Sequence, residues 1–374
     1  MHCHVVNLQE NLLGAEVYTI FFVRALAANG CQVTLHAHPR ARHWGALRAL
    51  GARIEPVESD AAIVSRLPQR AWLVTHAPVS DGFVDAVLPH HLLTGFCHMP
   101  LAGRRAGALA RYHRVYAVSQ HVLSTLPQVG ITAAFPEPLY GVAEFERFDT
   151  ARPDTLRPGL LYSWDQRKWR DRVLSWFDPL RFALHPAKPF ARTGAPTLGI
   201  ISAIGPIKQF DRLFAHIAPA IAALPDARVE VFGNGGYRSV TDLKRALAPL
   251  RERARFWGRV QHPEAIYPQL DFLLSGLPEK EALGLNLIEA QTLGTPVLAV
   301  RAPPFTETVA DGETGYLYRD PREDGGADFA AVLKRALAAP RLDARQAQAH
   351  LARFSQPSFN TRVAALIEDA HALL

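Results

Sequence analysis

The chain has 374 residues, of which 48% are hydrophobic and 20% are charged, and this composition excludes a disordered or fibrous protein. At roughly 100 to 200 residues per domain, the length predicts two globular domains, each with its own core. The formal net charge of +6 favours ligands that carry phosphate, or an anionic membrane surface, and is too small to indicate nucleic acid.

The sequence contains three cysteines, Cys3, Cys31 and Cys97, which lie far apart. A disulfide framework is therefore not expected, and the cytoplasm is the predicted compartment. The first residues, MHCHVVN, lack the features of a signal peptide, and no apolar run is long enough to cross a bilayer. His2 and His4 flank Cys3 in a predicted strand, where side chains alternate, so we expect packing and not a metal site.

The first 150 residues alternate short β-branched runs with helical patterns, which is typical of a parallel sheet with crossover helices. Strands are predicted at residues 4–6, 32–36, 53–56, 71–75, 92–97, 114–118 and 133–136. Helices are predicted at 15–29, around 43–50, and after Ser119, whose hydroxyl is placed to cap a helix.

The same rhythm begins again near residue 196. Strands are predicted at residues 197–205, 228–233, 255–257, 272–274 and 296–300. Helices are predicted at 211–224, 241–250 and 285–293, and a last helix at 357–374. The sequence thus predicts an α/β protein with two doubly wound, Rossmann-like domains: 1–150, then 196–356, with the helix 357–374 crossing back to the first domain.

A segment rich in tryptophan and arginine interrupts the linker between the domains, residues 151–195. It contains Trp164, Trp169 and Trp176. We expect a connecting helix whose tryptophans pack on one of the domains. The alternative is an interfacial or acceptor-contacting element, because tryptophan mixed with arginine and lysine suits a lipid headgroup layer.

The most informative stretch is EKEALGLNLIEAQTLGTPVLAVRAPPFTETVADGETGYLY, which begins at Glu279. Glu281 precedes Gly284 and a predicted helix start, and Glu289 follows eight residues later. On an ideal helix the two would be about 80° apart and about 12 Å along the axis. A helix start offers free amides to a phosphate, and carboxylates suit sugar hydroxyls, so the pattern fits a nucleotide sugar. The alternative is a pair of ordinary first-turn carboxylates favoured by the helix dipole.

This stretch resembles the donor-binding signature of glycosyltransferase family 4, the group 1 glycosyltransferases, which are retaining enzymes with the GT-B fold. The family motif is Glu-x7-Glu followed by Gly-x-Pro-Val, and Glu307, Gly312 and Gly315 are similar to its next conserved segment. The turn VFGNGGYRSVTDL, with Gly233 and Gly235, and the segment YGVAEFERF at 140–148 also resemble family patterns. The resemblance covers most of the chain and is stronger in the second half.

The resemblance implies a role for each matching residue of the second domain. Glu281 would bind hydroxyls of the donor sugar, and Glu289 would hold the ribose. Amides near Gly284, Leu285 and Asn286 would meet the diphosphate, close to the Gly233 and Gly235 turn. Lys208 would neutralise the leaving diphosphate. The family usually has an arginine five residues before this lysine, and here Ala203 stands in that position, so half of the cationic clamp is missing.

In the first domain the resemblance implies two more site residues. Gly14 begins a sequence, Gly-Ala-Glu, that is similar to the family loop passing the diphosphate and the acceptor. His98 follows a predicted buried strand and resembles the histidine that faces the donor sugar and the acceptor. The alternative for His98 is a structural cap of the strand. We interpret His76, His90 and His91 as packing or surface residues.

The implied function is transfer of a hexosyl group from a nucleoside diphosphate sugar to an acceptor hydroxyl with retention of configuration, in surface glycan or polysaccharide assembly. The two domains would face each other across a cleft. No Asp-x-Asp motif occurs in a fitting place, so neither a metal nor another cofactor is expected. The expected partners are the donor and a glycan or lipid-linked acceptor, and a peripheral contact with the inner face of the membrane is compatible with the charge. A nucleotide-sugar epimerase or a non-catalytic binding protein of the same fold is the alternative.

Overall fold

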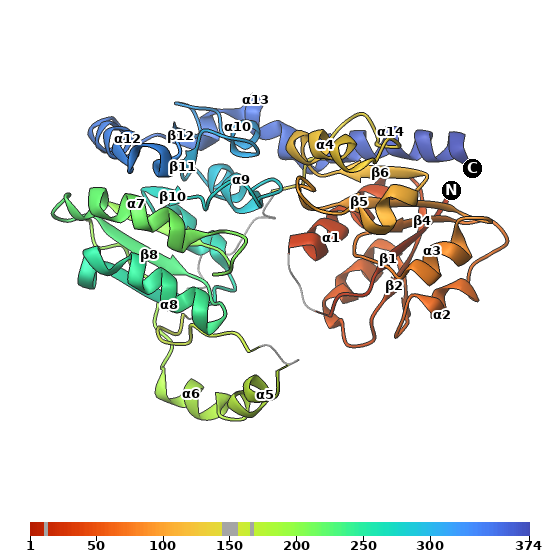
Figure 1. Cartoon of the computed structure of the whole chain (residues 1–374), viewed down its shortest axis with the longest axis horizontal. Helices are drawn as coiled ribbons and strands as arrows, with labels where there is room; N and C mark the ends of the chain where they lie inside the picture. Colours follow the sequence, from red (N-terminus) through yellow and green to blue (C-terminus); the bar gives the residue numbers. More distant parts are fainter. Residues whose placement is uncertain (11–13, 144–155, 165–167) are drawn as a thin grey trace. The chain divides into compact units, whose positions relative to one another are not determined.

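The computed structural model describes residues 1–10, 14–143, 156–164 and 168–374. The chain divides into two compact units. The first unit contains Met1–Glu144 together with Ala352–Leu374, and the second contains Phe145–Leu351. Figure 1 shows a β-sheet with crossover helices in each unit. The terminal helix is thus part of the first unit, although it follows the second in sequence.

Both sheets are six-stranded, parallel and of the same topology. The strand orders are β3-β2-β1-β4-β5-β6 in the first unit and β12-β11-β10-β7-β8-β9 in the second. In each case the order reverses between the first and the fourth strand of the unit, which places crossover helices on both faces and opens a crevice at the carboxyl ends of these two strands. The fold class predicted from the sequence, α/β with two Rossmann-like domains, is confirmed.

The first unit is built from six strands and the helices between them. The strands are β1 (His2–Asn7), β2 (Gln32–Ala37), β3 (Arg53–Pro56), β4 (Trp72–Thr75), β5 (Leu92–Cys97) and β6 (Arg114–Ala117). The helices are α1 (Gly14–Ala28), α2 (Ala61–Val64), α3 (Asp81–Val87), α4 (Gln120–Thr125) and α14 (Gln356–Leu373). Ser119 caps α4 as predicted, because its hydroxyl accepts from the amide of Val122 at 3.0 Å.

Helix α14 is anchored to the first unit by polar contacts at both ends. The side-chain amide of Asn29 donates to the backbone carbonyl of Asn360 at 3.0 Å. Near the other end the guanidinium of Arg114 makes two hydrogen bonds, of 2.7 and 2.8 Å, to the carboxylate of Asp369. This bidentate geometry fixes direction as well as distance.

The second unit has the same plan with more helices. Its strands are β7 (Thr197–Ile201), β8 (Arg228–Phe232), β9 (Ala254–Gly258), β10 (Phe272–Leu274), β11 (Val297–Val300) and β12 (Gly315–Tyr318). Its helices are α5 (Trp169–Ser175), α6 (Asp178–Leu184), α7 (Phe210–Ala222), α8 (Tyr237–Ala246), α9 (Leu285–Thr292), α10 (Phe305–Thr308), α11 (Pro321–Asp324), α12 (Ala327–Ala338) and α13 (Gln348–Leu351). Helix α7 is amphipathic and packs on the core of its unit through one apolar face. On that face Leu213, Phe214 and Ile217 are fully buried, while Arg212 is exposed.

Several predicted elements differ from those observed. The predicted strand 133–136 is wrong: only one bridge forms there, between Val115 and Ala134. The predicted helix around 43–50 is a 3-10 helix, Arg42–Leu50. The predicted helix 241–250 begins earlier, as α8, and ends at Ala246. A separate 3-10 helix, Ala248–Arg253, follows, with Pro249 in its first turn, because proline cannot continue an α-helix.

The expectation that the tryptophans of the linker segment 151–195 pack on a domain is wrong for two of them. Trp169 and Trp176, on α5 and just after it, are 72% and 77% exposed. Trp164 is half-buried, and its indole donates to the carboxylate of Asp178 at 3.0 Å. No helix in the described ranges is both long and apolar enough to cross a membrane.

Candidate functional site

Lys208 and Glu281 lie at the switch point of the second sheet. Lys208 follows β7 and Glu281 follows β10, and these two strands pair in parallel, with Phe272 opposite Leu198. Ligands of open α/β sheets bind in the crevice outside the carboxyl ends of such strands. The topology therefore brings together two residues of the predicted site that are far apart in sequence.

The two side chains form an ion pair. The ammonium of Lys208 donates to Oε2 of Glu281, and the side chains are only 22% and 12% exposed. The other oxygen of Glu281, Oε1, accepts from the amide of Gly284 at 3.2 Å. The carboxylate thus bridges the lysine and the start of α9. A cation, a carboxylate and a helix N-terminus thus meet at one place: a cation and a helix N-terminus suit phosphate, and a carboxylate can accept hydrogen bonds from hydroxyls.

The turn that carries Lys208 is held against the loop after β10 by the backbone. The carbonyl of Lys208 accepts from the amide of Leu277 at 3.0 Å. Gly276 makes this approach possible, because a Cβ on it would lie 2.1 Å from the Lys208 carbonyl oxygen. The sequence reasoning did not single out Gly276. Its signal is a glycine two residues after a buried strand, where a missing side chain allows close backbone approach.

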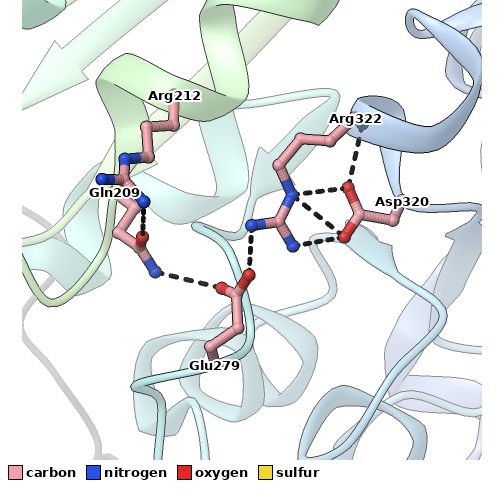
Figure 2. A network of polar contacts seen from close by, with 5 residues as sticks. All are labelled: Gln209, Arg212, Glu279, Asp320 and Arg322. Carbon is pink, nitrogen blue, oxygen red and sulfur yellow. Dashed lines mark hydrogen bonds and ion pairs between the residues drawn. The ribbon is translucent and has the colours of Figure 1, made fainter.

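A polar network braces the same turn, as Figure 2 shows. Gln209, next to Lys208 and in the left-handed region at φ 50°, donates through Nε2 to Glu279 at 3.0 Å. Glu279 also pairs with Arg322, which in turn contacts both carboxylate oxygens of Asp320. Arg212 donates to Oε1 of Gln209 at 3.2 Å. The network joins the loops after β7, β10 and β12, and nothing in the sequence pattern indicated it.

The carboxylate of Glu289 accepts a hydrogen bond from a buried tyrosine. The hydroxyl of Tyr267 donates to Oε2 of Glu289 at 2.8 Å, and Tyr267 is fully buried. Burial raises the pKa of Glu289, although the Tyr267 hydrogen bond and the charge of Lys208 act in the opposite direction. Tyr267 was also missed by the sequence reasoning, because it is distant in sequence from the Glu-x7-Glu motif.

Helix α9 begins where the sequence predicted, with Gly284 as the residue before its first turn. Gly284 has φ 82°, a conformation that glycine adopts without strain. The helix then starts with Leu285 and Asn286, and no acidic residue lies in its first turn. The side-chain amide of Asn286 donates to the carbonyl of Ile201 at 3.2 Å, which ties α9 to the end of β7. Diphosphate binding by these amides stays a prediction.

Gly233 and Gly235 bring the loop after β8 against the loop after β7. A Cβ on Gly233 would lie 1.9 Å from the carbonyl oxygen of Ser202, and a Cβ on Gly235 would lie 1.9 Å from that of Ile204. Both positions therefore require glycine. The exposed Ala203, where the family has arginine, lies between these two contacts.

His98 in the first unit pairs with a histidine that the sequence reasoning set aside as packing or surface. His76 follows β4, His98 follows β5, and Nδ1 of His76 lies 3.3 Å from Nε2 of His98. Burial lowers the pKa of both rings, that of His98 to about 4. The pair is therefore neutral near pH 7.

A cavity of about 490 Å³ adjoins this histidine pair. Its walls are mainly apolar and include Val79, Met99, Leu101, Leu109 and Tyr112. The cavity lies at the carboxyl end of the first sheet, where ligands of such sheets bind. It can hold an apolar or amphipathic group beside His98.

Gly14 begins α1, directly after residues outside the described ranges. No atom lies within 4 Å of the place that a Cβ on Gly14 would occupy, so the protein's own packing does not require glycine here. A role in ligand approach stays a prediction. The family-like segment 140–148 is described only to Ala143, whose amide donates to the carbonyl of Phe354 at 3.0 Å; its remaining residues lie outside the described ranges. In the described part of the chain, no group of three or more His, Cys, Asp or Glu side chains is placed to hold a metal ion.

The fold and the site define a GT-B protein. The structure is similar to that of HepE from Anabaena, solved with UDP and glucose, with a TM-score of 0.69 and 16% identity over 99% of this chain and 100% of that one. The likeness at this identity concerns the fold.

The sequence comparisons give a family match within the second unit. Residues 195–339 match the family described as "Glycosyl transferases group 1". The second unit therefore carries a group 1 glycosyltransferase domain, and the resemblance predicted from the motifs is confirmed.

Two relatives are informative. A D-inositol 3-phosphate glycosyltransferase from Streptomyces avermitilis is 27% identical over 93% of this chain and 78% of its own length. A GDP-mannose-dependent monoacylated alpha-(1-6)-phosphatidylinositol monomannoside mannosyltransferase from Corynebacterium glutamicum is 30% identical. That match covers 30% of this chain and only 32% of the length of the relative.

Proposed function

We propose that this protein transfers a hexosyl group from a nucleoside diphosphate sugar to an acceptor hydroxyl, with retention at the anomeric carbon. The observation that carries the proposal is the Lys208–Glu281 ion pair at the switch point of the second sheet, beside the start of α9. The family match at residues 195–339 supports it.

In this proposal the cationic and amide groups stabilise the leaving group, and the two glutamates bind hydroxyls of the donor. The bond between the anomeric carbon and the β-phosphate oxygen breaks, and the Lys208 ammonium with the α9 amides stabilises the departing diphosphate. Glu281 is then free to bind hydroxyls of the sugar, and Glu289 binds the ribose. The acceptor oxygen bonds to the anomeric carbon on the same face, and its proton passes to the departing phosphate, so no protein base is required.

For the acceptor we propose a lipid-linked glycan at the inner face of the membrane, in the assembly of a surface glycan. The mainly apolar cavity beside His98 supports an amphipathic acceptor. The name of the Corynebacterium relative, which describes a phosphatidylinositol mannoside acceptor, points in the same direction. No resident metal or other cofactor enters this proposal.

The experiment that tests the donor is thermal stabilisation by UDP, GDP, ADP and dTDP, alone and as sugar conjugates. A ligand that binds only the folded state raises the melting temperature in proportion to the logarithm of its concentration over its dissociation constant. We expect one nucleotide to stabilise the wild type, and to stabilise Lys208→Ala much less. If no nucleotide stabilises the wild type, the donor assignment is wrong.

Once the donor is identified, the next experiment distinguishes sugar transfer from epimerisation. Conversion of the donor sugar to an epimer with no acceptor present would contradict the transferase. With a glycolipid acceptor, NMR of the product anomer tests retention, and the opposite anomer would contradict it.

A further inference from the structure

The two short helices α5 and α6 carry an unusual concentration of exposed apolar side chains. We refer to residues 168–184, which contain both helices, as the tryptophan hairpin. Of the thirteen large exposed hydrophobic residues in the described part of the chain, eight lie here: Trp169, Val173, Leu174, Trp176, Phe177, Leu180, Phe182 and Leu184. Figure 1 shows α5 and α6 as a pair set apart from the sheet of their unit. Exposed apolar patches of this kind mark interaction surfaces.

The hairpin is fixed to its own unit by polar contacts, so its exposure is not that of an unfolded tail. Arg157 donates to the carbonyls of Phe182 and His185, each at 2.9 Å. Asp178 accepts from the Trp164 indole and from Arg181, whose guanidinium also stacks on the Trp164 ring, 4.7 Å from its centre. Asp178 and Arg181 therefore make the contacts with Trp164, and the eight apolar side chains named above remain exposed.

The exposed charge on the hairpin is positive. Arg170 and Arg172 are exposed; Arg170 pairs with the buried Asp171 at 3.1 Å, and Asp178 is engaged by Arg181. With four basic side chains against two acidic ones, residues 168–184 keep a net positive charge. Tryptophan and phenylalanine with flanking basic side chains match a lipid headgroup layer, because the rings enter the acyl boundary while the cations meet phosphate. The helices are too short to span a bilayer and long enough to lie on it.

We propose that the tryptophan hairpin docks the protein on an anionic bilayer surface, with Trp169, Trp176 and Phe177 entering the headgroup layer. The proposal deepens the proposed function, since it brings the enzyme to the membrane that would hold a lipid-linked acceptor. Charge complementarity favours this occupant over a second copy of the chain, because a two-fold contact between hairpins would bring together two surfaces of the same net positive charge.

Co-sedimentation with vesicles tests the proposal directly. The probes are vesicles of phosphatidylglycerol and phosphatidylcholine, and vesicles of phosphatidylcholine alone, mixed with the full chain. We expect the wild type to bind the anionic vesicles, to bind the neutral ones at least tenfold more weakly, and to be partly released by high salt. The variant Trp169→Ala with Trp176→Ala should lose at least tenfold in binding to the anionic vesicles.

A matched control removes exposed apolar side chains elsewhere. Leu50→Ala with Leu373→Ala should bind vesicles like the wild type, because both residues are exposed outside the hairpin. Equal melting temperatures of the variants in the absence of vesicles show that folding is unaffected. Wild-type vesicle binding by the double tryptophan variant, or no binding by the wild type, would overturn the proposal.

Two further outcomes separate this proposal from others. If the wild type sediments as a dimer without lipid and the double tryptophan variant as a monomer, the hairpin is an interface between copies and the membrane assignment is wrong. Vesicle binding does not depend on the donor site. Hairpin-dependent binding without stabilisation by any nucleotide would therefore support docking while contradicting the proposed donor site.

Discussion

The Lys208 ammonium donates to the Glu281 carboxylate although the two residues are 73 positions apart in the chain. They meet because β7 and β10 are neighbours at the point where the strand order reverses. In the free protein the Glu281 carboxylate accepts the hydrogen bond of the Lys208 ammonium, and in the proposed reaction the diphosphate replaces the carboxylate as the acceptor. The lysine is therefore held near its working position before the donor binds, which lowers the cost of ordering it.

We expect Lys208→Ala to lower kcat by about 10² to 10³-fold, because one electrostatic contact to the leaving group is lost, and Glu281→Gln to abolish most activity as well. The side chains are only 22% and 12% exposed, and Lys208→Ala leaves the Glu281 carboxylate without its cation, so we also expect a lower melting temperature and compare turnover at a temperature where both proteins are folded. The measurement is steady-state donor turnover. Lys280→Ala is the matched control, since it removes an exposed lysine next to the motif. Wild-type turnover in Lys208→Ala would refute the assignment.

Glu289→Gln should also abolish most activity, and Tyr267→Phe should be milder. The phenylalanine removes only the hydroxyl that donates to Glu289. If Glu289 binds the ribose equally in the ground and transition states, the donor KM should rise about fivefold, equivalent to about 1 kcal/mol, with kcat unchanged. A fall in kcat with an unchanged KM would show that Tyr267 does not act through donor binding.

Gly276→Ala should reduce both stability and activity. The added Cβ would lie 2.1 Å from the Lys208 carbonyl oxygen, so the turn that carries Lys208 must move. We expect a loss of about 1 to 3 kcal/mol in the free energy of unfolding, measured with urea, and a lower kcat. Gly82→Ala is the control, because no atom lies within 4 Å of its added Cβ. An unchanged kcat in Gly276→Ala would show that the close approach does not position the lysine.

The stability of the protein should fall as the pH falls from about 6.5 towards 4. His4 and His36 are buried side by side, with Nδ1 of His4 3.0 Å from Nε2 of His36, and burial lowers the pKa of each to about 4. Because the unfolded rings have a pKa near 6.5, the unfolded chain binds more protons in this window, and the free energy of unfolding rises with pH.

Each such histidine adds up to about 1.4 kcal/mol per pH unit to this slope. Urea unfolding at pH 7, 6 and 5 measures it. We expect a shallower slope for His36→Gln, and a wild-type slope for His90→Gln, which alters an exposed side chain. Equal slopes for the wild type and His36→Gln would contradict the assignment.

The sequence was sufficient for what depends on local chemistry. The β-branched runs and helical periodicity predicted every strand except β12, together with one at 133–136 that does not form, since parallel strands buried on both faces require continuous apolar residues. The start of α9 at Leu285 followed from Gly284, and the cap of α4 followed from Ser119. The Glu-x7-Glu spacing identified the family, because those residues are close together in the chain.

Tertiary structure decided the rest, because side chains that meet from different strands leave no local pattern. The pairing of Lys208 with Glu281, the support of Glu289 by Tyr267, and the contact of His76 with His98 all depend on strand order. For the tryptophan hairpin, the sequence favoured a linker with packed tryptophans, and this expectation was wrong for Trp169 and Trp176. Only the fold shows these rings exposed, because burial is a property of what surrounds a residue and not of the residue itself.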